Sequence, residues 1–118
     1  MSYIGQTGPY LKQPPRIRNK RHLAFLHELP CVCTGAMQPI VAHHLLRCES
    51  RLGMGGKAGD QHTIPLLHSV HVALHHNGDE TSFLAGYGID APECLANLLY
   101  ENTGNFNTCI EIIQNARE

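Results

Sequence analysis

The segments IVAHH at residues 40–44 and TIPLLHSVHVALHHNG at residues 63–78 decide the fold of this chain. All nine histidines lie between residues 22 and 76, and the informative ones gather in these two segments. A β-branched run leads into His43 and His44, which indicates a strand. The second segment places four histidines on one predicted helix. We therefore expect a histidine site built from a strand and a helix.

The second segment predicts a helix with several histidines on one face. The helix is expected to start near residues 63–65, because proline is tolerated in the first turn, and to end at Asn77-Gly78. His71 and His75 are four residues apart and share a face, with His68 one turn further back. Two such histidines can hold one divalent ion, and a third ligand from a hairpin completes the set.

Local signals predict the remaining elements. Asn19 is expected to cap a helix over residues 20–29. Residues 30–46 predict a β-hairpin whose second strand carries the two adjacent histidines. Residues 47–62 hold four glycines and predict a loop. Short helices are expected to follow the capping residues Asp79, Asp90 and Asn107.

Length favours one domain, and the predicted strands and helices make it an α+β domain. The chain has 118 residues, and we expect a flexible basic N-terminal arm over residues 1–18 and a single domain over residues 19–118. Five irregularly spaced cysteines predict free thiols or metal ligands rather than disulfides. The absence of a long apolar run or secretory signal predicts a soluble, cytoplasmic protein without a membrane partner.

Charge is strongly polarised along the chain. Residues 1–57 hold eight of the nine basic residues against two acids, and residues 58–118 hold one basic residue against eight acids. This asymmetry favours a basic face or arm that contacts phosphates. A chance segregation of solvated surface charges is the alternative.

Short motifs follow one another in a consistent order over about residues 20 to 90. They are KRHLAF at 20–25, LPC at 29–31, AH at 42–43, GMG at 53–55, Lys57, Asp60, TIPL at 63–66, His71-x3-His75, GDE at 78–80 and GID at 88–90. This order resembles the HNH, or ββα-metal, nuclease superfamily, and most closely the phage and prophage group that includes the recombination-enhancement-function nuclease.

The resemblance implies a ββα-metal core of a β-hairpin and a metal-binding helix, with additional N- and C-terminal helices. It implies a metal-dependent endonuclease that hydrolyses DNA phosphodiester bonds, encoded by a phage or prophage. His43 matches the general base, and His71 and His75 match the metal ligands. One divalent ion (Mg, Mn, Ni or Zn) is expected to stabilise the pentacovalent phosphorane and the leaving 3′ oxygen. Asp60 matches an acidic position that could orient an imidazole.

His44 leaves the assignment of the base open. Some relatives, the nuclease colicins among them, use adjacent histidines, one binding the metal and the next acting as base. Adjacent side chains of a regular strand point to opposite faces, so both can serve only if the strand bends. We assign the base to His43, with His44 as the alternative base or a further metal ligand.

DNA contacts are expected from basic residues, which bind the backbone without reading bases. The candidates are Lys57, Arg47 and Arg51 in the loop and Arg16, Arg18, Lys20 and Arg21 near the arm. Sequence preference is therefore expected to be weak unless a protein partner supplies targeting; the oligomeric state is left open.

Many relatives also hold a structural zinc ion, and here its ligand pattern is altered. Cys31-Val32-Cys33 is one residue too close for Cys-x2-Cys, so we predict no structural zinc. A one-residue shift in alignment would instead give a zinc site of Cys31, Cys33, His68 and His71. The alternative function is a catalytically inactive nucleic-acid-binding or assembly module that retains the fold.

Overall fold

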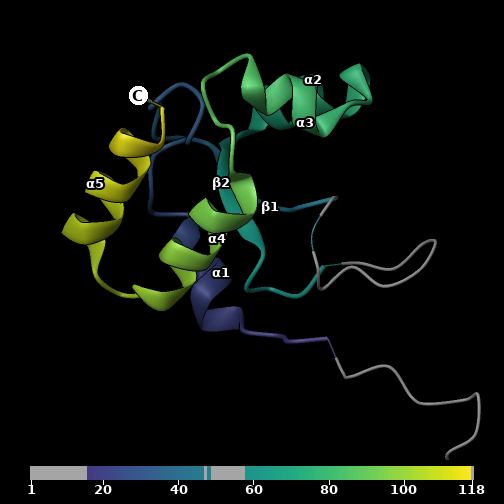
Figure 1. The fold of residues 1–118 in the computed structure, drawn as a ribbon. Helices are drawn as coiled ribbons and strands as arrows, with labels where there is room; N and C mark the ends of the chain where they lie inside the picture. Colours follow the sequence, from purple (N-terminus) through teal and green to yellow (C-terminus); the bar gives the residue numbers. More distant parts are fainter. Residues whose placement is uncertain (1–15, 47, 49–57, 118) are drawn as a thin grey trace, which may run out of the picture.

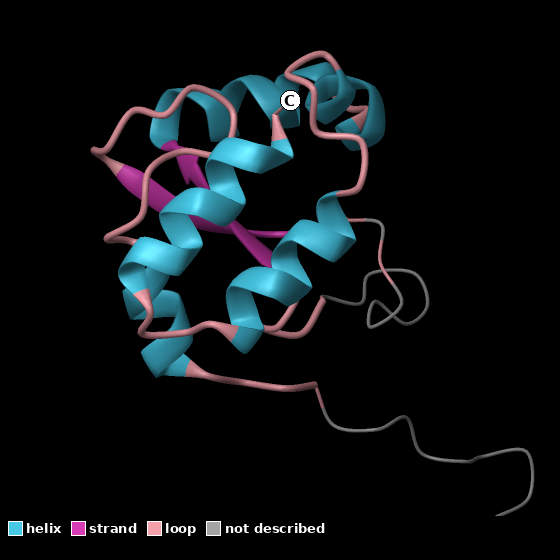
Figure 2. Ribbon diagram, turned by 60° about the vertical axis from the view of Figure 1, so that its left-hand side comes forward, coloured by secondary structure: helices cyan, strands magenta, loops and turns pink. Residues whose placement is uncertain are grey.

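Five helices surround a two-stranded sheet in the described part of the chain (Figure 1, Figure 2). The structure is a computed structural model and describes residues 16–46, 48 and 58–117. In chain order the elements are α1 (Lys20–Leu26), β1 (Ile40–His44), β2 (Thr63–Leu67), α2 (His68–Asn77), α3 (Glu80–Ala85), α4 (Pro92–Glu101) and α5 (Phe106–Ala116).

The sheet pairs two segments separated by the predicted loop. β1 and β2 are antiparallel, and the register places His43 opposite Ile64 and His44 opposite Thr63. The prediction that residues 30–46 form a hairpin by themselves is wrong, because the partner of β1 comes after the loop. The predicted strand itself, and its delivery of both histidines, is confirmed.

β2 replaces what the sequence predicted as the first turn of a helix. Its residues Thr63 to Leu66 are all buried, and a segment buried on both sides favours extended, β-branched chain over an amphipathic helix. Pro65 fits because its carbonyl accepts a hydrogen bond from the Val32 amide at 3.0 Å, on the side away from β1. The N–H and C=O of one strand residue point to the same side, so an N–H at position 65 would also face away from β1. Proline therefore removes no hydrogen bond between β1 and β2. The helix starts at His68 instead.

The helices cover the sheet in two groups. α1 packs on β1, α4 packs on β2, and α5 lies beside α4 (Figure 1, Figure 2). α2 and α3 form the second group and lie side by side at the end of the sheet where α2 follows β2. None of the helices that the structure describes has the length and hydropathy of a membrane span.

Side-chain caps explain where two of the helices begin. The Asn19 side chain accepts a hydrogen bond from the His22 amide at 3.0 Å, and Asp79 accepts one from Ser82 at 3.2 Å, so both predicted caps are confirmed. The other two caps are displaced. α4 begins after Ala91 and α5 begins after Asn105, in place of Asp90 and Asn107.

Gly78 ends α2 with a φ of +83°, and a Cβ at this position would meet no atom within 4 Å. Gly78→Ala is therefore expected to destabilise the fold by about 1–2 kcal/mol, through backbone strain alone. Gly78→Asn should cost less, because asparagine tolerates the left-handed region. Urea unfolding at constant m-value measures both; equal midpoints for the three proteins would contradict the assignment.

Candidate metal centre

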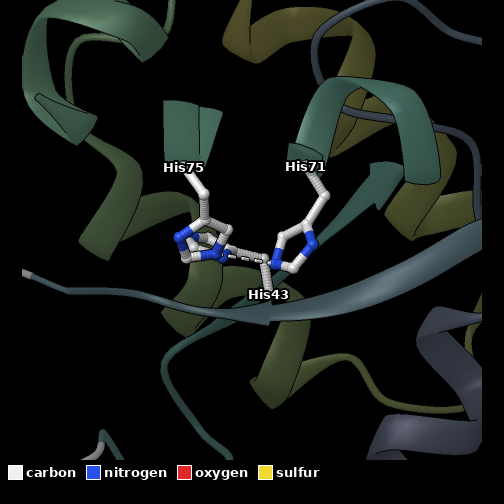
Figure 3. A group of neighbouring side chains, drawn as sticks. All are labelled: His43, His71 and His75. Atoms are coloured by element: carbon white, nitrogen blue, oxygen red, sulfur yellow. Dashed lines mark hydrogen bonds between the residues drawn. The ribbon is translucent and has the colours of Figure 1, made fainter. Parts of the chain in front are cut away.

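Three histidines from two elements converge on one point. His43 comes from β1, and His71 and His75 come from α2; one ring nitrogen of each lies within 4.8 Å of the other two. Figure 3 shows the three rings pointing toward one another across the gap between strand and helix. The Nε2 atoms of His71 and His75 are 3.1 Å apart. Within the residues that the structure describes, this is the one group of three or more such ligands.

The connection between β2 and α2 brings this group together. Leu67 is the last residue of β2 and occupies the N-cap position of α2, so the helix leaves the sheet without a linker. Buried Val70 and Leu74 hold α2 against the core and turn the face with His71 and His75 toward β1. His43 is 2% exposed, His71 is half-buried and His75 is exposed, so the group runs from the core to the surface.

The group suits a divalent cation. Around tetrahedral zinc with bonds of about 2.0–2.1 Å, ligand nitrogens are roughly 3.4 Å apart, so the observed separations require only small movements. Burial, followed by repulsion from His43 and His75, lowers the pKa of His71 to about 4. Its imidazole is therefore neutral near pH 7, which is the form that binds metals. His71 and His75 also line an open surface hollow with Val72 and His76, through which solvent reaches the site.

A buried carboxylate holds His43. Glu80 Oε1 lies 2.7 Å from His43 Nε2, and both side chains are 2% exposed. The Leu46 amide donates to both carboxylate oxygens at 3.0 Å. The sequence pattern contained Glu80 within its GDE motif but assigned it no role. A glutamate in the first turn of a helix is ordinarily exposed, so no local signal indicated its burial.

His44 lies outside the three-histidine group and pairs with Asp60. His44 Nε2 is 2.7 Å from Asp60 Oδ1, and the Asn19 amide donates to Oδ2 at 2.6 Å. Burial acts to raise the pKa of Asp60, but the hydrogen bonds from His44 and Asn19 outweigh it and the pKa is lowered. The expected orienting contact of Asp60 is thus present, and its partner is His44.

The suggested role of His44 as a metal ligand is not supported by this geometry. Residues 43 and 44 are neighbours on β1, and side chains alternate along a strand. His43 faces α2 and is buried, whereas His44 is 28% exposed and faces Asp60. The structure therefore groups His43, and not His44, with the helical histidines.

The predicted DNA-contacting residues fall into two sets. Lys57, Arg47 and Arg51 lie outside the described residues. Arg18, Lys20 and Arg21 are exposed at the start of α1, and Arg16 is half-buried.

The end of the predicted arm is hydrogen-bonded to Asp60, the partner of His44. The Asp60 amide donates to the Ile17 carbonyl at 2.8 Å, and the charge of Arg16 contributes to the lowered pKa of Asp60. The last residues assigned to a flexible arm therefore contact the loop that holds His44.

The alternative zinc set is not assembled. Cys31 and Cys33 are buried, His68 is exposed, and His71 belongs to the group with His43. Within the described residues the geometry thus favours the alignment that gives His71 to the strand–helix site. The absence of a structural zinc ion stays a prediction.

Comparison with protein families gives one match. Residues 7–102 match the family described as protein of unknown function, DUF968. The chain belongs to this family. No curated protein and no solved structure matches it. Since the family description carries no activity, the chemistry has to be argued from the site.

The lowered pKa of His71 predicts acid sensitivity of the metal-free protein. Unfolded His71 takes up a proton near pH 6.5, whereas the folded form resists protonation until about pH 4. Stability should therefore fall as the pH drops from about 6.5 toward 4. His71→Asn should flatten this fall in melting temperature. His22, whose pKa is also lowered, acts equally in both proteins, so equal pH slopes would contradict the prediction.

Proposed function

We propose that this protein is a metal-dependent endonuclease of the HNH type that hydrolyses phosphodiester bonds of DNA. The observation that carries the proposal is the convergence of His43, His71 and His75 beside a separate His44–Asp60 pair. This arrangement supplies two chemical functions from one strand and one helix. Nucleases of this class require both functions, a cation site and a base.

In this proposal the metal ligands are His43, His71 and His75. A divalent ion held there supplies Lewis-acid stabilisation of the charge that develops on the phosphate and on the leaving 3′ oxygen. Three histidine ligands would leave other coordination positions of the ion for phosphate and water. The exposed position of His75 and the adjoining hollow give a backbone phosphate access to the site.

We assign the general base to His44, which reverses the roles first expected for the two adjacent histidines. His44 is the last residue of β1, so the regular alternation that turns its side chain away from His43 ends here. The assignment requires the His44 ring to reach a phosphate held at the metal ligands. Asp60 accepts the Nε2 proton of His44, so Nδ1 carries the free lone pair and can take a proton from water. The water oxygen then bonds to phosphorus, the bond to the 3′ oxygen breaks, and the leaving oxygen takes a proton from solvent. His43 is unsuited to this role because its ring is buried between Glu80 and the α2 histidines.

The DNA is proposed to lie along the basic start of the domain. Arg18, Lys20 and Arg21 are exposed there, and the Ile17–Asp60 hydrogen bond ties this segment to the loop that holds His44. Such contacts bind phosphates irrespective of sequence, so cutting is proposed to have weak sequence preference. Phage or prophage origin and a cytoplasmic site of action belong to the same proposal.

Two variants separate the roles of the adjacent histidines. His43→Ala should lose both metal binding and plasmid nicking with Mg²⁺ or Mn²⁺. His44→Ala should keep metal binding and lose about 10²- to 10⁴-fold in nicking rate, as expected for removal of a general base. Titration calorimetry and a nicking time course measure the two properties.

His68→Ala is the matched control, because His68 is on α2 but outside the group. It should leave both properties at wild-type values. Loss of metal on His68→Ala would favour the alternative zinc alignment. Binding of DNA with no nicking by the wild type would favour the inactive nucleic-acid-binding module.

Asp60→Asn should lower the nicking rate by about 10- to 100-fold and leave metal affinity unchanged, because Asp60 orients His44 and touches none of the metal ligands. The pH dependence of the nicking rate should also differ between Asp60→Asn and the wild type. A wild-type rate in a folded Asp60→Asn protein would refute the assignment of His44 as the oriented base.

A further inference from the structure

Glu80 is a carboxylate buried beside the metal centre. It is 3% exposed, and a carboxylate at such a position is strongly destabilising unless hydrogen bonds satisfy it. Its oxygens accept from the His43 ring at 2.7 Å and from the Leu46 amide at 3.0 Å. Both partners belong to the short stretch of chain that carries the two adjacent histidines.

Helix capping does not explain this placement. Asp79 occupies the N-cap of α3, and its side chain binds the Ser82 amide and hydroxyl at the surface. Glu80 is the first residue inside the helix, and its side chain turns inward to the end of β1. The GDE motif thus divides its two acids between the helix end and the site.

The contact with His43 determines which ring nitrogen faces a metal. The Leu46 amide donates to both oxygens of Glu80, as expected for an ionised carboxylate, which can only accept. This assigns the proton of His43 to Nε2, which contacts Glu80, and the lone pair to Nδ1. Carboxylate–histidine pairs of this kind orient metal-bound imidazoles in general and increase their basicity. Since the Leu46 amide binds the same carboxylate, Glu80 also fixes the backbone on the far side of His44.

We propose that Glu80 is a positioning residue of the metal centre, which holds the His43 ring in its metal-binding tautomer and the 43–46 segment in place. The inference rests on the proposed metal site. With Asp60, it gives each of the adjacent histidines its own buried carboxylate. Glu80 acts on metal affinity, whereas Asp60 acts on the base.

The test measures zinc binding without DNA. Glu80→Ala should weaken the Kd for Zn²⁺ by about 10- to 100-fold. Glu80→Gln, which keeps one acceptor oxygen and the side-chain volume but loses the charge, should give a smaller loss. A competition titration with a zinc-chelating dye gives the Kd, and circular dichroism of the metal-free proteins verifies folding.

Glu93→Gln is the matched control. Glu93 also faces a histidine, with 3.4 Å between its oxygen and His62 Nε2, but this pair is not part of the metal group. The Glu93→Gln protein should bind Zn²⁺ with the Kd of the wild type. If Glu80 only stabilised the fold, zinc affinity of the folded Glu80→Gln protein would also equal the wild-type value.

A second readout needs no metal. Long-range ¹⁵N–¹H NMR spectra of the metal-free wild type should show His43 protonated at Nε2, and Glu80→Gln should populate the other tautomer. Unchanged zinc affinity and tautomer in the folded Glu80 variants would overturn the inference. Failure of the wild type to cut DNA would overturn the nuclease proposal but not this inference, whereas failure to bind Zn²⁺ would overturn the metal site and this inference with it.

Discussion

The antiparallel pairing of β1 with β2 is the constraint on which the rest of the structure depends. β2 continues directly into α2, so the register of this pair also sets where the first turns of the helix lie relative to β1. A shift of one residue would turn His43 away from His71 and His75 and bring His44 toward them. The buried contact of His43 with Glu80 opposes such a shift, because the shift would break this 2.7 Å pair.

The two buried carboxylates beside β1 are each paired with a histidine of that strand. His43 with Glu80 and His44 with Asp60 each combine an imidazole and a carboxylate at 2.7 Å. The remaining carboxylate atoms bind backbone amides, so the desolvation cost of each acid is offset by two kinds of partner. Each carboxylate fixes the orientation of one ring. The ring of His43 is thereby held for the proposed role of metal ligand, and the ring of His44 for the proposed role of general base.

The basic residues near the start of α1 lie in a segment that is bonded to Asp60. The basic start of the domain is fastened to Asp60 by the Ile17 carbonyl and the Asn19 amide. Asp60 in turn holds His44. A DNA phosphate that binds the basic residues would thus contact the segment bonded to Asp60. Asp60 would therefore link the proposed DNA-binding residues to His44, the proposed base.

The sequence by itself determined the features that depend on near neighbours. The Asn19 and Asp79 caps, the end of α2 at Gly78 and the shared face of His71 and His75 follow from local backbone geometry, and each is observed. The tertiary structure decided the rest. Thr63–Leu67 became a strand, because burial against distant segments outweighed the local signal of a proline-containing first helical turn.

The tertiary structure was also needed to decide which of His43 and His44 joins the metal group, and to show the position of Glu80. Alternation along β1 states that the two rings point to different faces, but only the packing of α2 against that strand says which ring meets His71. Glu80 contacts a residue 37 positions away. Contacts of this kind depend on how elements dock, which residue spacing within a single element does not encode.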